Sequence, residues 1–168
     1  MSRHDAHGFA FSPDADQDGE IRAVLGHAVS GAADVGEVLA AVEGVRGKDH
    51  AAWFAAWRDL GERLVAQGDA SAAAGHAVSA AAAYLRASTY LATAVNAVAA
   101  LGSEDALLPT FRAHRQAWDR WVDASGLDVE RVRIPYEDGA LPGYLFRAPG
   151  SRPRPTVVAV NGSDGSLS

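Results

Sequence analysis

The most constraining feature of this sequence is its last apolar segment, Pro155–Val160, which runs directly into a glycine-rich stretch. The residues from Thr156 to Val160 are mostly β-branched, as in strands that lie inside a parallel sheet with both faces covered. A glycine-rich turn at the end of such a strand leaves backbone N–H groups that can hold an anion or a developing oxyanion. The segment therefore predicts an interior strand, and an interior strand requires neighbouring strands on both sides.

Most of the chain before this segment has the apolar spacing of α-helices. Residues 1–17 are predicted to form a mobile leader, from which Phe9 and Phe11 could pack onto the body. Residues 18–126 are predicted to form an all-α helical domain. Its expected helices are 20–30, 34–45, 48–67, a long helix that ends at Gly102, and a last one from Ser103 to Gly126.

The helix over 48–67 has the clearest pattern. Trp53, Trp57, Leu60 and Leu64 fall at i, i+4, i+7 and i+11 and form one apolar stripe. Gly68 follows the stripe, and glycine commonly ends helices, so we expect the helix to stop there.

After Gly126 the apolar period changes from that of a helix to that of a strand. Val129–Tyr136 alternates, with Val132 and Ile134 on one face and Arg131 and Arg133 on the other. Asp138-Gly139 is a turn signal, and Leu141–Phe146 completes a predicted β-hairpin. Residues 127–168 are therefore predicted to begin a second domain, with a hairpin followed by the interior strand.

Composition excludes several classes of function. The formal charge of −6 argues against nucleic acid as a partner, because phosphate binding needs a basic face. The chain has no cysteine, which excludes disulfides, thiolate metal sites and a cysteine nucleophile. We find no metal-binding motif and no nucleotide-binding loop, so no cofactor is expected. Ala77–Ser103 is alanine-rich and contains Arg86, which favours a buried helix over a membrane span.

The second half of the chain resembles the opening of the α/β-hydrolase fold. The resemblance lies in Ile134-Pro135-Tyr136, Leu141–Phe146, Pro155–Val158 and Gly162–Ser166, in this order. Tyr84–Leu91 is similar to a segment of the branch that has an N-terminal helical domain. That branch contains fermentation/respiration-switch-like esterases, dihydroxypseudooxynicotine hydrolase and fungal pigment chain-shortening hydrolases. The predicted fold class is thus α/β, as a truncated α/β-hydrolase with an all-α domain before it.

The resemblance implies a role for the loop after Val160. In the family this loop supplies a backbone N–H of the oxyanion hole, which implies Ser163 as donor, with Asp164 next in line and Gly162 before them. One preorganised donor stabilises a tetrahedral intermediate by roughly 2.7–4 kcal/mol. Two alternatives stay open: Gly162 and Gly165 merely allow a tight turn, or Ser163 is itself the nucleophile of a Gly-x-Ser-x-Gly-like motif.

No convincing catalytic triad is present. In the family the nucleophile, the acid and the histidine all follow the third strand, and this chain ends before them. His114 falls on an apolar helical stripe and is interpreted as a hydrogen-bonded core residue. We therefore expect the chain to be the N-terminal part of a longer hydrolase: a truncated gene product, a fragment or one half of a split enzyme.

The helical domain supplies the predicted substrate-binding residues. Tyr84, Arg86 and Tyr90 are polar-tipped groups on an otherwise apolar helix, which makes them candidates to face a substrate. The alternatives are an internal ion pair for Arg86 with an acidic residue of a neighbouring helix, and hydroxyls that are hydrogen-bonded within the core for the two tyrosines.

The resemblance implies cofactor-independent serine hydrolysis of an ester or a ketone-flanked C–C bond in a small molecule, through an acyl-enzyme. It also allows a homodimer formed through the helical domain. The alternative function is a helical binding or scaffold module whose terminal strands pair with a partner protein. The N-terminus lacks a secretory signal, so a cytoplasmic location is expected.

Overall fold

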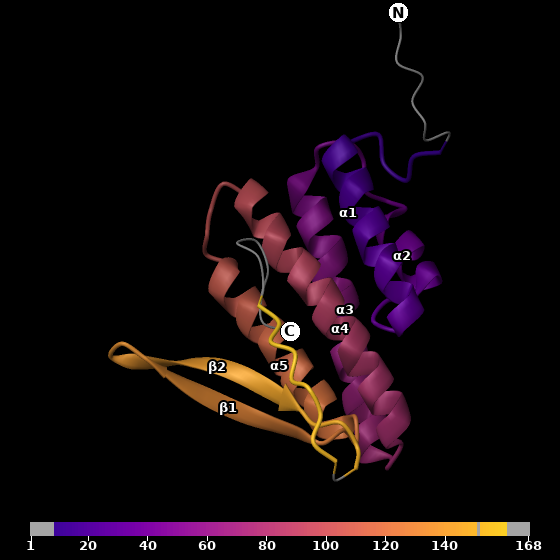
Figure 1. Ribbon diagram of the computed structural model, residues 1–168. Coiled ribbons are helices and arrows are strands. Elements are labelled where there is room, and N and C mark those ends of the chain that lie inside the picture. Colours follow the sequence, from indigo (N-terminus) through magenta and orange to yellow (C-terminus); the bar gives the residue numbers. More distant parts are fainter. Residues whose placement is uncertain (1–8, 151, 161–168) are drawn as a thin grey trace, which may run out of the picture.

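The computed structural model describes residues 9–150 and 152–160. The chain forms five α-helices, two short 3₁₀ helices and one β-hairpin in these residues (Figure 1). In chain order they are α1 (Ala15–Gly26), η1 (His27–Ser30), α2 (Val35–Val42), α3 (His50–Ala73), α4 (Ala77–Ala97), η2 (Val98–Ala100), α5 (Leu107–Ala124), β1 (Val129–Tyr136) and β2 (Gly139–Phe146). We refer to α1 through α5 as the helical region.

Three helices begin directly after an aspartate. The side chains of Asp14, Asp34 and Asp49 each accept a hydrogen bond from a backbone N–H in the first turn of α1, α2 and α3. These caps satisfy donors that a helix N-terminus otherwise leaves unpaired. Because of its cap, α1 begins at Ala15, ahead of the start at Glu20 that the sequence predicts.

Gly68 does not end α3, which corrects the prediction from sequence. The helix continues to Ala73, and Gly75, with φ of 79°, provides the left-handed turn that follows it. Gly68 instead allows a close approach between helices. A Cβ atom at Gly68 would lie 2.4 Å from Cε1 of Tyr84 on α4, so the tyrosine ring fills the space that a side chain would need.

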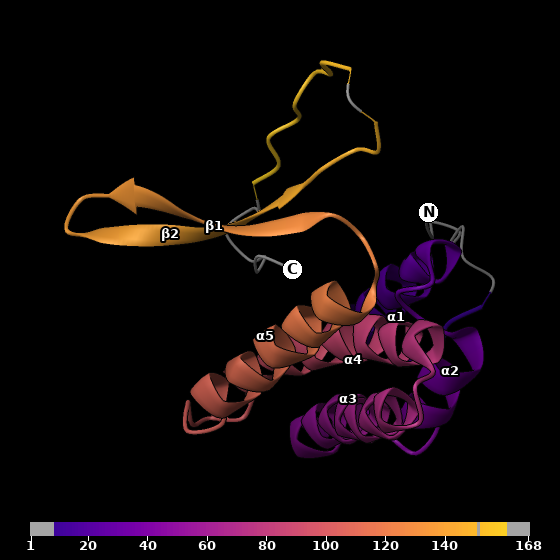
Figure 2. The same cartoon turned by 90° about the horizontal axis from the view of Figure 1, so that it is seen from below.

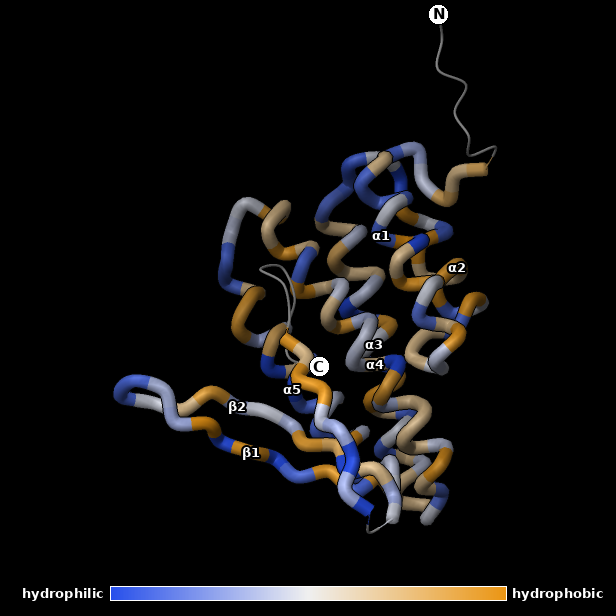
Figure 3. The backbone as a smooth tube through the Cα atoms, viewed as in Figure 1, coloured by the Kyte–Doolittle hydropathy of each residue, from blue (hydrophilic) through white to orange (hydrophobic). Residues whose placement is uncertain are grey.

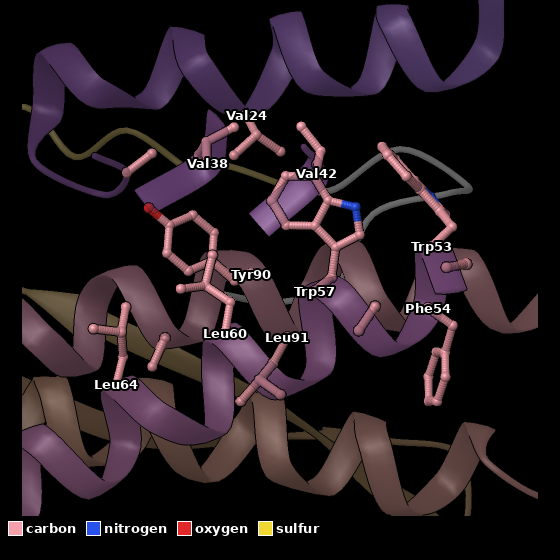
Figure 4. Packing of buried hydrophobic residues seen from close by; sticks show 14 of the residues in the cluster. Val24, Val38, Val42, Trp53, Phe54, Trp57, Leu60, Leu64, Tyr90 and Leu91 are labelled. Carbon is pink, nitrogen blue, oxygen red and sulfur yellow. The ribbon is translucent and has the colours of Figure 1, made fainter. Parts of the chain in front are cut away.

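The hydrophobic core lies where α3 and α4 pack together and α1 and α2 cover them. Within the bundle α4 packs between α3 and α5. Trp57, Leu60, Tyr90 and Leu91 are at most 1% exposed and interlock at the centre, with valines of α1 and α2 above them (Figure 4). The predicted stripe of α3 is therefore confirmed as its buried face.

The hairpin has the predicted strands, and β1 has the predicted bounds. The two strands pair antiparallel with Arg131 opposite Tyr144 and Ile134 opposite Leu141. Glu137, with φ of 47°, lies in the tight turn between them. The turn end of the hairpin lies away from the helices, and the hairpin is on the opposite side of the molecule from α1 and α2 (Figures 1 and 2).

The predicted interior strand at Thr156–Val160 is not formed in this structure. The segment has no strand assignment, and within the described residues the sheet contains β1 and β2 alone. Val157, Val158 and Val160 are 88%, 83% and 86% exposed, and the segment is an apolar stretch at the surface (Figure 3). A β-branched run becomes a strand through ladder partners, and this segment is not paired with β1 or β2.

Candidate functional site

The predicted substrate-binding residues of α4 divide into two groups with separate partners. Arg86 and Tyr90 both contact Glu37 of α2. The Arg86 Nε donates to Glu37 Oε2 at 2.9 Å, and the Tyr90 hydroxyl donates to the same oxygen at 3.0 Å. The Tyr90 oxygen also accepts a hydrogen bond from the backbone N–H of Asp34 at 2.8 Å. Arg86 and Glu37 thus form the internal ion pair that the sequence left open as an alternative for Arg86.

Tyr90 is the buried member of this group, and Arg86 and Glu37 are partly exposed. Tyr90 is fully buried, and its burial raises the pKa of the phenol, with the nearby Glu37 carboxylate acting in the same direction. A buried phenol that both donates and accepts is fully satisfied, and the carboxylate it binds is held at the boundary between α2 and α4. The group therefore fixes α2 on the bundle.

Tyr84 belongs to a second group on the other side of α4. Its hydroxyl donates to Asp69 Oδ1 of α3 at 2.7 Å. Arg120 of α5 also donates to Asp69, at 3.1 Å, and its guanidinium lies over the Tyr84 ring at 5.9 Å from the centroid. Burial raises the pKa of Tyr84. This group links α3, α4 and α5.

His114 lies inside the bundle, as its place on the apolar stripe predicts. The ring is fully buried, and Nδ1 lies 2.9 Å from the backbone carbonyl oxygen of Ser88 and 3.2 Å from its hydroxyl. Burial lowers the pKa of His114, which favours the neutral ring. The residue links α4 and α5.

The predicted oxyanion-hole residues Gly162, Ser163 and Asp164 lie outside the described residues. The nearest described part of the chain is the extended segment that ends at Val160. It bounds a hollow of about 720 Å³ against α5 and β2, and the hollow is lined in part by Trp118, Tyr144, Phe146, Arg147, Arg152 and Arg154.

The hollow has the volume of a small-molecule site, which is typically about 300–1,000 Å³. Among the described residues, two buried donors beside Tyr144 have no acceptor, Arg115 Nη1 and Trp118 Nε1. Tyr84, Arg86 and Tyr90 do not line the hollow. The structure therefore does not bring the predicted substrate-binding residues to this place.

The described part of the chain contains no cluster of three or more His, Asp or Glu residues that could hold a metal ion. In the same residues, no helix has both the length and the apolar character to cross a membrane.

Comparison with known proteins identifies relatives along nearly the whole chain. The chain is 38% identical over 165 residues to the α/β hydrolase xenA of Xenoacremonium sinensis, covering 93% of this chain and 37% of xenA. It is 34% identical over 161 residues to the α/β hydrolase gkaG of Penicillium citrinum, with the same two shares. It is 32% identical over 155 residues to the 20-hydroxy-prefusarin hydrolase FUS2 of Gibberella moniliformis, covering 86% of this chain and 36% of FUS2.

This chain is similar along nearly its whole length to proteins named as α/β hydrolases. No family model matches it. The chain spans about 37% of the length of the α/β hydrolases it matches best among those named here. The matched residues include the helical region and the hairpin. These elements are consistent with a portion of an α/β-hydrolase structure.

Sequence reasoning missed the partners of the site residues. Glu37 is 49 residues from Arg86 in the chain, and Asp69 is 15 residues from Tyr84. Spacing along one helix shows which residues share a face, but it does not show which residue of another helix will meet them. For Asp69, the available signal was a charged residue next to Gly68 on a helix with an apolar stripe.

Proposed function

We propose that this chain is the N-terminal part of a serine hydrolase that cleaves an ester or a ketone-flanked C–C bond of a small molecule through an acyl-enzyme. The observation that carries the proposal is the similarity along 93% of the chain to proteins named as α/β hydrolases. The order of elements agrees with it, because a helical region precedes a hairpin and a β-branched segment that leads into a glycine-rich stretch.

In this proposal the backbone N–H of Ser163 donates to the oxyanion of the tetrahedral intermediate. A backbone donor that is fixed before the reaction stabilises charge as it develops, without the cost of reorienting solvent. The nucleophile, the acid and the histidine belong in this proposal to a part of the hydrolase outside these 168 residues.

The helical region acts as a cap in the same proposal. Tyr84, Arg86 and Tyr90 keep their internal partners there. A substrate group that contacted them would have to compete with Glu37 and Asp69. The cap therefore contributes to the substrate site mainly through its shape, and less through direct polar contacts with the substrate.

Two substitutions at one position test the role of Ser163 in the complete polypeptide that carries these 168 residues. Ser163→Ala keeps the backbone N–H and removes the hydroxyl, so turnover of a p-nitrophenyl ester should stay close to wild type. Ser163→Pro removes the N–H, and kcat should fall roughly 100- to 1,000-fold. Circular dichroism of both variants checks that each is folded.

Labelling with a fluorophosphonate, followed by peptide mapping, locates the nucleophile in the same polypeptide. We expect the label on a serine beyond residue 168. A label on Ser163, or a loss of activity in Ser163→Ala equal to that in Ser163→Pro, would show that Ser163 is the nucleophile and would refute the proposed donor role. Absence of both labelling and turnover in a folded complete polypeptide would refute the hydrolase proposal itself.

A further inference from the structure

The β-hairpin is attached to the helical region through side chains of α5. A two-stranded hairpin on its own is marginally stable in water, so its position depends on what it packs against. Along β1 the residues alternate between two faces, and the face that carries Arg131 is the one that meets α5. Tyr144 is directly opposite Arg131 on β2 and shares this face.

Five side chains form a continuous polar chain across this contact. Arg115 Nη2 of α5 donates to the Tyr144 hydroxyl at 2.6 Å, and that hydroxyl donates to Asp119 Oδ1 at 2.7 Å. Arg131 Nε donates to the same Asp119 oxygen at 3.1 Å, and Arg131 Nη2 donates to Asp123 Oδ1 at 2.9 Å. We call these five residues the Asp119 cluster.

The geometry of the Asp119 cluster comes from two regular spacings. Arg115, Asp119 and Asp123 are at i, i+4 and i+8, so they follow one face of α5. Arg131 and Tyr144 are a cross-strand pair, so they project to the same side of the hairpin. A slip of one residue in either strand would turn one of them to the opposite face and break the cluster.

Charges alternate along the cluster, and Asp119 Oδ1 accepts from both Tyr144 and Arg131. Arg131 and Asp119 are 45% and 42% exposed, so either ion pair by itself would contribute little. Surface ion pairs contribute more to stability when several charges form a network. In this cluster the Arg131 guanidinium binds two carboxylates. Tyr144 lies at the centre, and its ring also packs edge-on against Trp118 with centroids 6.0 Å apart.

Among the described residues, no such attachment is found on the outer face of the hairpin. Ile134 and Leu141, which are opposite each other on that face, are 54% and 50% exposed. Tyr136 is on the same outer face and is 56% exposed. The polar contacts that hold the hairpin are thus concentrated on its inner face.

We propose that the Asp119 cluster fixes the angle at which the hairpin leaves the helical region, with Asp119 as the positioning residue and Tyr144 as the link between its two halves. The cluster works only in one strand register and one rotational setting of α5. It therefore sets the relative orientation of the helices and the first two strands. This inference stands independently of the proposed function, because it concerns how two parts of the described structure are joined.

Hydrogen exchange on the whole 168-residue chain tests the attachment. Tyr144→Phe removes one hydroxyl and keeps the ring, and Asp119→Asn keeps the shape and removes the charge. Each should speed exchange of hairpin amides in 129–146 roughly five- to tenfold, the effect of losing one ordinary hydrogen bond in a partly exposed cluster. Exchange in α3 and α4 should not change. The matched control is Tyr136→Phe, which removes a hydroxyl from the outer face and should leave hairpin exchange at the wild-type rate.

The double variant Asp119→Asn/Tyr144→Phe should speed exchange by less than the product of the two single effects, because both changes weaken the Tyr144–Asp119 hydrogen bond. The proposal is overturned if Tyr144→Phe and Tyr136→Phe behave alike. It is also overturned if hairpin amides of the wild type exchange at the rate of an unprotected peptide, or if α3 and α4 lose protection together with the hairpin.

A distance measurement tests the angle itself. The chain has no cysteine, so single cysteines placed at Asp138 in the hairpin turn and at the exposed Gln67 on α3 can carry spin labels without further changes. We expect a narrow distribution of label distances in the wild-type background and with Tyr136→Phe, and a broad one with Tyr144→Phe. Distributions of equal width in all three would contradict the proposal. Neither experiment uses turnover, so its outcome does not depend on the hydrolase proposal.

Discussion

Substitution of Gly68 by alanine tests the helix contact that sequence reasoning misread. The new Cβ would lie 2.4 Å from Tyr84 Cε1, whereas ordinary contact begins at 3.4 Å, so the ring would have to retreat by about 1 Å. The ring is not free to do so, because its hydroxyl is bound to Asp69 and Arg120 lies over its face. We therefore expect Gly68→Ala to destabilise the chain.

The magnitude follows from two opposing effects. Overpacking a close contact costs typically about 1–3 kcal/mol, and displacement of the ring also weakens the bond to Asp69. Replacing glycine by alanine inside a helix contributes up to about 1 kcal/mol in the opposite direction. Because the packing cost is the larger of the two, we expect the free energy of unfolding to fall by about 1–2 kcal/mol.

Urea titration followed by circular dichroism measures this change, and Gly19→Ala is its matched control. Gly19 is within α1, and a Cβ there would meet no heavy atom within 4 Å. Gly19→Ala should therefore stabilise the chain by about 0.5–1 kcal/mol. If both substitutions shift the free energy of unfolding in the same direction, the packing argument for Gly68 is wrong.

Two further predictions concern buried polar groups. Burial lowers the pKa of His114 below its usual 6.5, so the stability that its neutral ring contributes is present above that pH and is lost as the pH falls below it. Between about pH 7 and about pH 5 the wild type should lose more stability than His114→Gln, and equal slopes in urea titrations would refute this. Tyr90→Phe removes the bond to Glu37 and should cost about 2 kcal/mol in thermal denaturation, whereas Tyr136→Phe should change stability by less than about 0.5 kcal/mol.

The helices and the hairpin could be predicted because their signals are local. The stripe of Trp53, Trp57, Leu60 and Leu64 is a property of one helix, and the alternation of β1 is a property of one strand. Gly68 was misread because its role depends on a ring from another helix. A small residue that ends a helix and one that admits a neighbour look the same in sequence.

The remaining differences have the same origin. The β-branched residues of Thr156–Val160 express a preference for a sheet interior, but a strand exists only where a neighbour offers its backbone. The residues that distinguish the two readings of Arg86 and Tyr90 are on α2, far along the chain. The oxyanion donors remain a prediction, because Gly162, Ser163 and Asp164 lie outside the described residues.

The distribution of core side chains has a consequence for how this architecture can be divided and varied. In the described residues the continuous hydrophobic core runs from Ile21 to Ala117 and takes no side chain from the hairpin. A cut between Ser125 and Gly126 would therefore remove none of the packing that holds the helices together. The interior of the bundle can thus vary without touching the hairpin, whereas the aromatic and charged surface of α5 has to match the strands that pack on it.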